Sequence, residues 1–374
     1  MLLEDPRAND QGISLGWQGR LASAVRRRAR RVWRSVAPGA CHWPIESALE
    51  WLLSRTTPGG ICDAAGLPDP VLSRACLPTL TILGQRSLLA RWSPWLREAE
   101  LQTVQDAAAP AGEEWESPVA EFARQTVRDY LCGDRAAGDR GWSRLVRLQK
   151  PSGGIPLSWH GAGWRRESVL ATKYFLDAAV LQARLAFERG AGTLPSEIAE
   201  DDGRLGAVIS GMAPLASGPA HVADIGCGSG RFLKRLAGQF PAMTWTGIDP
   251  SPAMLEQLPE GMGRRSGGLP SIPADDGAFD GVLAVEALEH SLVPEAAVAE
   301  LCRVVRPGGR VVIIDKHSAW QPLSECEPWE RWFEPHEVLS WLGAHCDRVA
   351  AWPVGHGAQQ SPSGLFWCWS GRRG

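Results

Sequence analysis

A glycine-rich loop between a predicted strand and a predicted helix constrains the fold of this chain more than any other feature. The β-rich stretch 221–225 ends in Asp224 and Ile225, glycines follow at positions 226, 228 and 230, and a helical pattern occupies 231–239. Glycines in such a loop let the backbone adopt positive φ and approach a ligand without a Cβ in the way. The helix that follows presents free N–H groups and the positive end of its dipole, which suit a carboxylate. The unit predicts an α/β fold with a ligand at the loop.

The spacing of the glycines distinguishes between possible ligands. A dinucleotide-binding loop has the pattern G-x-G-x-x-G, but counting from Gly226 its third glycine position is occupied by Arg231, and the loop has no P-loop lysine. Asp224 would oppose a pyrophosphate and could accept a hydrogen bond from an ammonium group. Asp249, at the end of the next predicted strand, is placed to bind two ribose hydroxyls. These residues favour a nucleoside joined to an amino acid, which is S-adenosylmethionine.

The second half of the chain alternates between predicted strands and predicted helices. Strands are expected at 221–225, 245–248, 281–285 and 310–315, with helices at 231–239, 252–258 and 294–305 between them. This order is typical of βαβ units and a parallel sheet. Two further strands, 348–352 and 365–370, are separated by a loop rich in Gly, Ser, Gln and Pro and suit an antiparallel hairpin.

Five segments of this half resemble the class I S-adenosylmethionine-dependent methyltransferases, in particular the branch that contains the ubiquinone and menaquinone biosynthesis methyltransferases. In chain order they are the glycine loop 224–230, the acidic turn 247–249, and the segments 272–280, 284–290 and 301–309. The resemblance covers about residues 205–374 of the chain. It implies a Rossmann-like, seven-stranded α/β sheet with an antiparallel C-terminal hairpin, and S-adenosyl-L-methionine as the cofactor.

The resemblance also implies which residues bind the cofactor. The candidates are Asp224, Gly226, Cys227, Gly228, Gly230, Asp249, Leu269 and Glu286. One position departs from the family pattern, because Gly268 stands where the family usually has an aspartate that hydrogen-bonds the adenine amino group. The adenine would then depend on apolar contacts and backbone groups near Leu269. We therefore expect weaker cofactor binding.

The segment at the end of the predicted strand 281–285 narrows the class of methyl acceptor. It reads Ala-Val-Glu-Ala-Leu-Glu-His over 284–290. It lacks the Asn/Asp-Pro-Pro-Tyr/Phe of DNA and amide N-methyltransferases and the Pro-Cys of cytosine-C5 enzymes. We expect a small-molecule acceptor, with O-methylation favoured over C-methylation. Transfer to a hydroxyl needs alignment and a general base. His290 with Glu289 is the first candidate for that base and His317 the second, with a purely structural role as the alternative.

The same segment suggests a metal site. Glu286, Glu289 and His290 form the pattern Glu-x-x-Glu-His, which is similar to a motif proposed to hold a divalent ion in the ubiquinone O-methyltransferase. Spacings of i, i+3 and i+4 on a helical turn allow three such groups to converge on one ion. A divalent cation is therefore a second cofactor candidate.

The first half of the chain shows no strand–helix alternation. It predicts helices at 45–54, 88–103, 118–131 and 168–189 and an all-α domain over 41–200, before the methyltransferase domain over 201–374. Segment 148–159 faintly resembles the Gln…Gly-Gly…Trp loops of α/α-toroid terpene cyclases and prenyltransferases, but it lacks the acidic catalytic clusters of that family. Residues 1–40 form a basic N-terminal segment in which 20–36 predict an amphipathic helix. That helix either packs on its own domain or contacts an anionic membrane surface.

Composition excludes several classes of function. Hydrophobic residues make up 44% and charged residues 22% of the 374, as in soluble globular proteins. The net charge of −3 provides no field that would attract nucleic acid, and the nine cysteines include no CxxC pair. We predict a cytoplasmic two-domain methyltransferase in which residues 20–36 either pack on their own domain or make peripheral membrane contact, and the oligomeric state is left open. Two alternatives are a cofactor-binding scaffold without catalysis and an isoprenoid-binding or isoprenoid-processing helical module fused to a tailoring methyltransferase.

Overall fold

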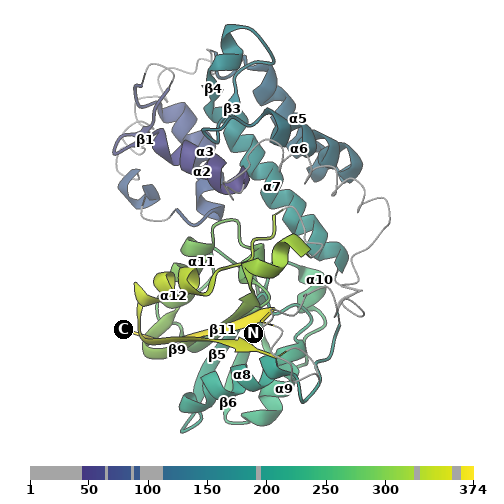
Figure 1. The fold of residues 1–374 in the computed structure, drawn as a ribbon, viewed down its shortest axis with the longest axis vertical. Helices are drawn as coiled ribbons and strands as arrows, with labels where there is room; N and C mark the ends of the chain where they lie inside the picture. Colours follow the sequence, from purple (N-terminus) through teal and green to yellow (C-terminus); the bar gives the residue numbers. More distant parts are fainter. Residues whose placement is uncertain are drawn as a thin grey trace, which may run out of the picture.

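The computed structural model describes residues 44–63, 66–85, 88–92, 113–190, 195–323, 329–355 and 364–374. The basic helix predicted at 20–36 and most of the helix predicted at 88–103 lie outside these residues. Figure 1 shows a helical region, made of the described residues within 44–190, above an α/β domain made of those within 203–374. Among the described residues, no helix has both the length and the apolar character needed to cross a bilayer.

Five helices dominate the helical region. They are α2 (Pro44–Ser54), α3 (Pro70–Ile82), α5 (Pro118–Leu131), α6 (Arg135–Leu148) and α7 (Val169–Gly190). The structure confirms the predicted helices at 45–54, 118–131 and 168–189, and adds α3 and α6. Helices α3, α5 and α6 begin after Asp69, Ser117 and Asp134, whose side chains each accept a hydrogen bond from a backbone N–H of the first turn. Such caps satisfy donors that have no partner within the helix.

The region is not purely α-helical, which corrects the predicted all-α domain. Two short antiparallel pairs occur, β1 (Thr56–Thr57) with β2 (Gly60–Ile61) and β3 (Ile155–Pro156) with β4 (Glu167–Ser168), and the single-turn helix η2 (Ala162–Arg165) lies inside the second connection. Both pairs form at Gly/Pro-rich segments of the sequence. Proline and glycine there favour a chain reversal over continuation of a helix.

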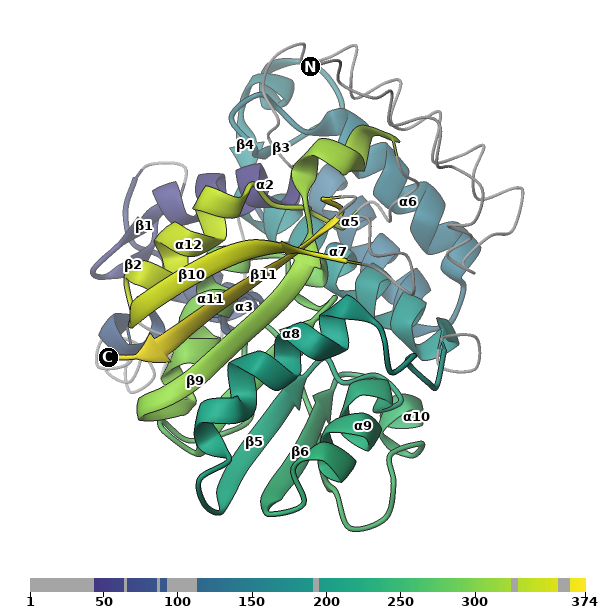
Figure 2. The same ribbon diagram turned by 60° about the horizontal axis from the view of Figure 1, so that its bottom comes forward.

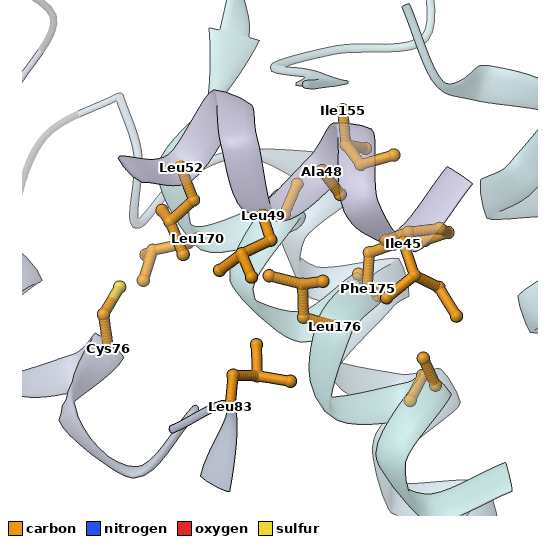
Figure 3. Packing of buried hydrophobic residues seen from close by; sticks show 14 of the residues in the cluster. Ile45, Ala48, Leu49, Leu52, Cys76, Leu83, Ile155, Leu170, Phe175 and Leu176 are labelled. Carbon is orange, nitrogen blue, oxygen red and sulfur yellow. The ribbon is translucent and has the colours of Figure 1, made fainter. Parts of the chain in front are cut away.

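The helical region is held together by one hydrophobic cluster. Figure 3 shows side chains of α2 packed against α7, with Ile45 beside Phe175, Leu49 beside Leu176 and Leu52 beside Leu170. All of these side chains are at most 5% exposed. The cluster also includes Leu292 and Trp329, which belong to the α/β domain. The two parts of the chain therefore share a core.

The α/β domain contains the predicted seven-stranded sheet. Its strands are β5 (Ala220–Ile225), β6 (Met243–Asp249), β7 (Gly263–Ser266), β8 (Phe279–Val285), β9 (Val305–Lys316), β10 (Cys346–Val354) and β11 (Phe366–Arg373), in the spatial order β10-β11-β9-β8-β5-β6-β7. Strands β5 to β9 pair in parallel, and β11 pairs antiparallel with both β9 and β10. Only β7 was not predicted, because all four of its residues are exposed and carry no apolar pattern.

Helices cover both faces of the sheet, as Figure 2 shows. One face packs against α8 (Gly203–Met212) and α9 (Arg231–Gln239), and the other against α11 (Pro294–Arg303) and α12 (Pro335–Gly343). Successive side chains of β5 point to opposite faces of the sheet. Val222 therefore packs in the core beside α8 and α9, and Ala223 packs in the core beside α11 and α12. The short helices η3 (Ala213–Leu215), α10 (Pro252–Leu255), η4 (Leu288–His290) and η5 (Ser318–Leu323) lie in the connections.

Candidate functional site

The glycine loop has the backbone conformation that the sequence predicts. Gly226, Gly228 and Gly230 have φ values of 77°, 53° and 80°, and α9 begins at Arg231. A Cβ added to Gly226 would lie 2.6 Å from the Cβ of Ala287, whereas a Cβ on Gly228 would meet nothing within 4 Å. The loop is thus packed against the protein at Gly226 and faces open space at Gly228.

Two carboxylates flank this loop at the ends of neighbouring parallel strands. Asp224 is 2% exposed and Asp249 is 6% exposed. The Asp249 carboxylate accepts hydrogen bonds of 2.9 Å from the backbone N–H groups of Gly228 and Ser251. Those bonds join the end of β6 to the glycine loop after β5, so the structure brings together the residues predicted for the amino-acid and ribose ends of a ligand.

Burial shifts the ionisation of both carboxylates. Desolvation, with a smaller contribution from the nearby charge of Asp249, raises the pKa of Asp224 from 3.8 to about 8, although Arg231 opposes the shift. Desolvation also raises the pKa of Asp249 above its ordinary value. Two buried acids side by side are costly unless a ligand supplies positive charge and hydrogen-bond donors. An ammonium group together with ribose hydroxyls fits that requirement.

A second group of ionisable side chains lies where β8 and β9 end. The Lys316 ammonium is 2.6 Å from Oε1 of Glu289, and Nε2 of His290 is 3.3 Å from the same oxygen. The Asp315 carboxylate accepts backbone hydrogen bonds from Glu289 and Lys316. Burial lowers the pKa of His290 below its ordinary value, although Glu289 opposes the shift. Phe187 of α7 meets the His290 ring edge-on with the ring centroids 5.0 Å apart.

Residues 223–313 match the family described as methyltransferase domain. The matched segment runs from β5 to β9, so it contains the glycine loop, Asp224, Asp249 and the Glu289–His290 pair. The matched part of the α/β domain is therefore a methyltransferase domain.

This methyltransferase domain is similar to several curated proteins. The O-methyltransferase cnsE of Penicillium expansum is 36% identical over 107 residues, which cover 25% of this chain and 37% of that protein. An uncharacterized methyltransferase of Mycobacterium bovis is 31% identical over 149 residues, 39% of this chain and 53% of that protein. The ubiquinone/menaquinone biosynthesis C-methyltransferase UbiE of Cupriavidus metallidurans is 36% identical over 81 residues, 21% of this chain and 30% of that protein. The chain spans about half or less of the length of these relatives.

The geometry of the methyltransferase domain corrects the predicted metal triad of Glu286, Glu289 and His290. Glu286 follows β8 with a φ of 54°, and its Oε1 forms ion pairs with Arg204 and Arg231. Two guanidinium groups therefore neutralise this carboxylate. Within the described residues, the three-residue group with converging donor atoms is instead Glu289, His290 and Glu330. Its Glu289 already binds the Lys316 ammonium, which would repel a cation.

The remaining predicted residues occupy different places in the methyltransferase domain. Nε2 of His317 is 3.3 Å from Oε2 of Glu334, the residue that caps α12, so His317 lies against that helix start. Leu269 packs at the edge of the core shared with α11 and α12. Cys227 is buried in the glycine loop, and burial raises the pKa of its thiol above the usual range.

Several residues at the site were not predicted from the sequence. They are Arg204, Lys316 and Glu330, and Arg231 was noted only as a departure from the dinucleotide pattern. Lys316 had one available signal, because it follows Asp315 directly at the end of the fifth strand, where parallel sheets place ligands. The others depend on contacts between distant parts of the chain.

Proposed function

We propose that this chain transfers a methyl group from S-adenosylmethionine to a small-molecule acceptor. The observation that carries the proposal is the buried pair Asp224 and Asp249 on either side of the glycine loop, joined by the hydrogen bond from Gly228 to Asp249. The match over residues 223–313 supports it.

Each part of the loop has a role toward the cofactor. Asp224 would accept hydrogen bonds from the amino group, Gly226, Cys227, Gly228 and Gly230 would bring the backbone close, and Asp249 would bind the ribose. The bound cofactor supplies an electrophilic methyl group. Glu286 acts indirectly, because it holds Arg231 at the start of α9.

His290 is the proposed general base, positioned by Glu289. The Glu289 carboxylate faces Nε2 of His290 at 3.3 Å, so it favours the tautomer with the proton on Nε2 and leaves Nδ1 with a free lone pair. Nδ1 is buried and has no hydrogen-bond partner, since Glu330 Oε1 is 3.8 Å away. A buried nitrogen without a partner is costly, and an acceptor hydroxyl would satisfy it and lose its proton there. This arrangement supports O-methylation over C-methylation.

The acceptor would bind between the two parts of the chain. Phe187 of α7 contacts His290, and Leu292, two residues further on, belongs to the core of the helical region. Pockets often lie at such interfaces. The helical region would thus cover the acceptor, and the Phe187 ring beside the base suits an acceptor with an apolar or ring-bearing body.

The test is calorimetric titration of the full chain with S-adenosylhomocysteine, followed by transfer of tritiated methyl into the small-molecule fraction of a cell extract. We expect binding and transfer, with both strongly weakened in the Asp224→Asn and Asp249→Asn variants. Absence of binding by the unaltered chain would refute the proposal. Binding without transfer would favour the second candidate, a cofactor-binding scaffold, which the glycine at position 268 supports.

A further inference from the structure

The helical region reaches the part of the methyltransferase domain that would hold the nucleoside. Oγ of Ser251, the N-cap of α10, is 3.0 Å from Oε2 of Glu188, which lies near the C-terminal end of α7. Figure 1 shows that end of α7 directed at α10. A second contact between the two parts of the chain involves Gly84 of the helical region. A Cβ added to Gly84 would lie 3.0 Å from the carbonyl oxygen of Pro270. The helical region therefore approaches both residues 249–251 and residues 269–270.

Ser251 joins two carboxylates from different parts of the chain. Its backbone N–H donates to Oδ1 of Asp249, and its hydroxyl donates to Oε2 of Glu188. The two acids are close enough that the charge of Glu188 contributes to the raised pKa of Asp249. Two like charges side by side destabilise each other unless a donor-rich ligand lies beside them. If Glu188 only helped to cap α10, its charge would not be needed. The Ser251 hydroxyl already caps that helix, because it accepts a hydrogen bond from the backbone N–H of Met254.

We propose that Glu188 is a cofactor-binding residue supplied by the helical region, whose carboxylate accepts a hydrogen bond from the nucleoside beside Asp249. This inference rests on the proposed function. The nucleoside offers two kinds of donor, the ribose hydroxyls and the adenine amino group, and the site lacks a side chain at Gly268. A carboxylate from α7 would compensate for that gap and would make cofactor binding depend on the contact between the two parts of the chain.

The experiment is calorimetric titration of the full chain with S-adenosylhomocysteine. Glu188→Gln keeps an oxygen that can accept from Ser251 but removes the charge. We expect about a tenfold loss of affinity, as for a hydrogen bond to a charged group, and an unchanged melting temperature of the ligand-free protein. The matched control is Glu121→Gln, an exposed glutamate of α5 paired with Arg124, and its affinity should equal that of the unaltered chain.

A second variant separates binding from positioning. Ser251→Gly removes the hydroxyl but keeps the backbone donor to Asp249, and glycine is tolerated at an N-cap. We expect this variant to bind within threefold of the unaltered chain. If it loses as much affinity as Glu188→Gln, Glu188 acts only through Ser251 and the inference is wrong. Unchanged or higher affinity in Glu188→Gln would also overturn it, since relief of repulsion on Asp249 would then be the whole effect.

A ligand analogue identifies the donor. S-inosylhomocysteine has a carbonyl in place of the adenine amino group. If Glu188 binds the amino group, the unaltered chain should prefer S-adenosylhomocysteine by about tenfold and Glu188→Gln should not. If Glu188 binds the ribose, the substitution should weaken both ligands equally. Failure of the unaltered chain to bind either ligand would instead count against the proposed function itself.

Discussion

Lys316 and Glu289 form a buried ion pair, with 2.6 Å between the ammonium nitrogen and Oε1, at the ends of β9 and β8. Burial alone would lower the pKa of Lys316, but the Glu289 carboxylate raises it above its usual range. The neighbouring Asp315 responds in the opposite way, since burial and the charge of Glu289 raise its pKa well above the ordinary value. The short distance between the Lys316 ammonium and the Glu289 carboxylate therefore stabilises a cation that burial alone would disfavour.

Removal of the Lys316 charge should destabilise the protein. Lys316→Met leaves Glu289 buried without its cation, and loss of one partner of a buried pair costs about 3–5 kcal/mol. We expect the midpoint of urea unfolding, followed by tryptophan fluorescence, to fall accordingly. The double variant Lys316→Met with Glu289→Gln removes the uncompensated charge and should recover most of that loss. A single variant as stable as the unaltered chain would contradict this account.

Cofactor affinity should rise with pH in the neutral range because of Asp224. Its pKa of about 8 in the ligand-free protein means that this carboxyl is mostly protonated at pH 7. An ammonium ligand binds the ionised form, so binding must release a proton below the pKa. We expect the affinity for S-adenosylhomocysteine to increase by up to about tenfold per pH unit between pH 6 and 8 and then to level off.

The proton released by Asp224 can be measured directly. Titrations at pH 7 in buffers of different ionisation enthalpy should show release of close to one proton. The Asp224→Asn variant should bind weakly and without the pH dependence. An equally steep pH dependence in that variant would assign the effect to another group.

Features set by short stretches of sequence were predictable, whereas contacts between distant segments were not. The glycine loop and six of the seven strands of the large sheet follow from local patterns, because turn conformation and buried strands need particular residue types. Strand β7 lies at the sheet edge with all four residues exposed, so no apolar pattern marks it. The partners of Glu286 and Glu289 could not be predicted, because Arg204 and Lys316 reach them only once the sheet has formed.

Trp329 should be required for the stability of the helical region although it lies beyond it in the sequence. Its side chain is 1% exposed and packs in the same cluster as α2 and α7. Trp329→Ala leaves a large cavity in that core, and such substitutions cost about 3–5 kcal/mol. We expect a lower melting temperature by calorimetry. Leu131→Ala, at a side chain that is 68% exposed, is the control and should melt within about 1 °C of the unaltered chain.

His290 should carry the base function that O-methylation requires. In His290→Gln the rate of methyl transfer should fall by about 10²–10⁴-fold, the usual contribution of a general base, while the affinity for S-adenosylhomocysteine stays within twofold. His336→Gln, at an exposed histidine of α12, should leave the rate unchanged. A rate within twofold of the unaltered chain in His290→Gln would exclude this residue as the base.

The pH profile separates a base from a residue that only holds the loop. Burial lowers the pKa of His290 below 6.5, so the neutral imidazole predominates above that pH and the rate should be flat there. At a pH below the lowered pKa of His290 the rate of methyl transfer should fall, because the ring takes up a proton. Glu289 raises the His290 pKa toward its ordinary value, so Glu289→Gln should move this fall to lower pH, whereas a structural role would leave its position unchanged.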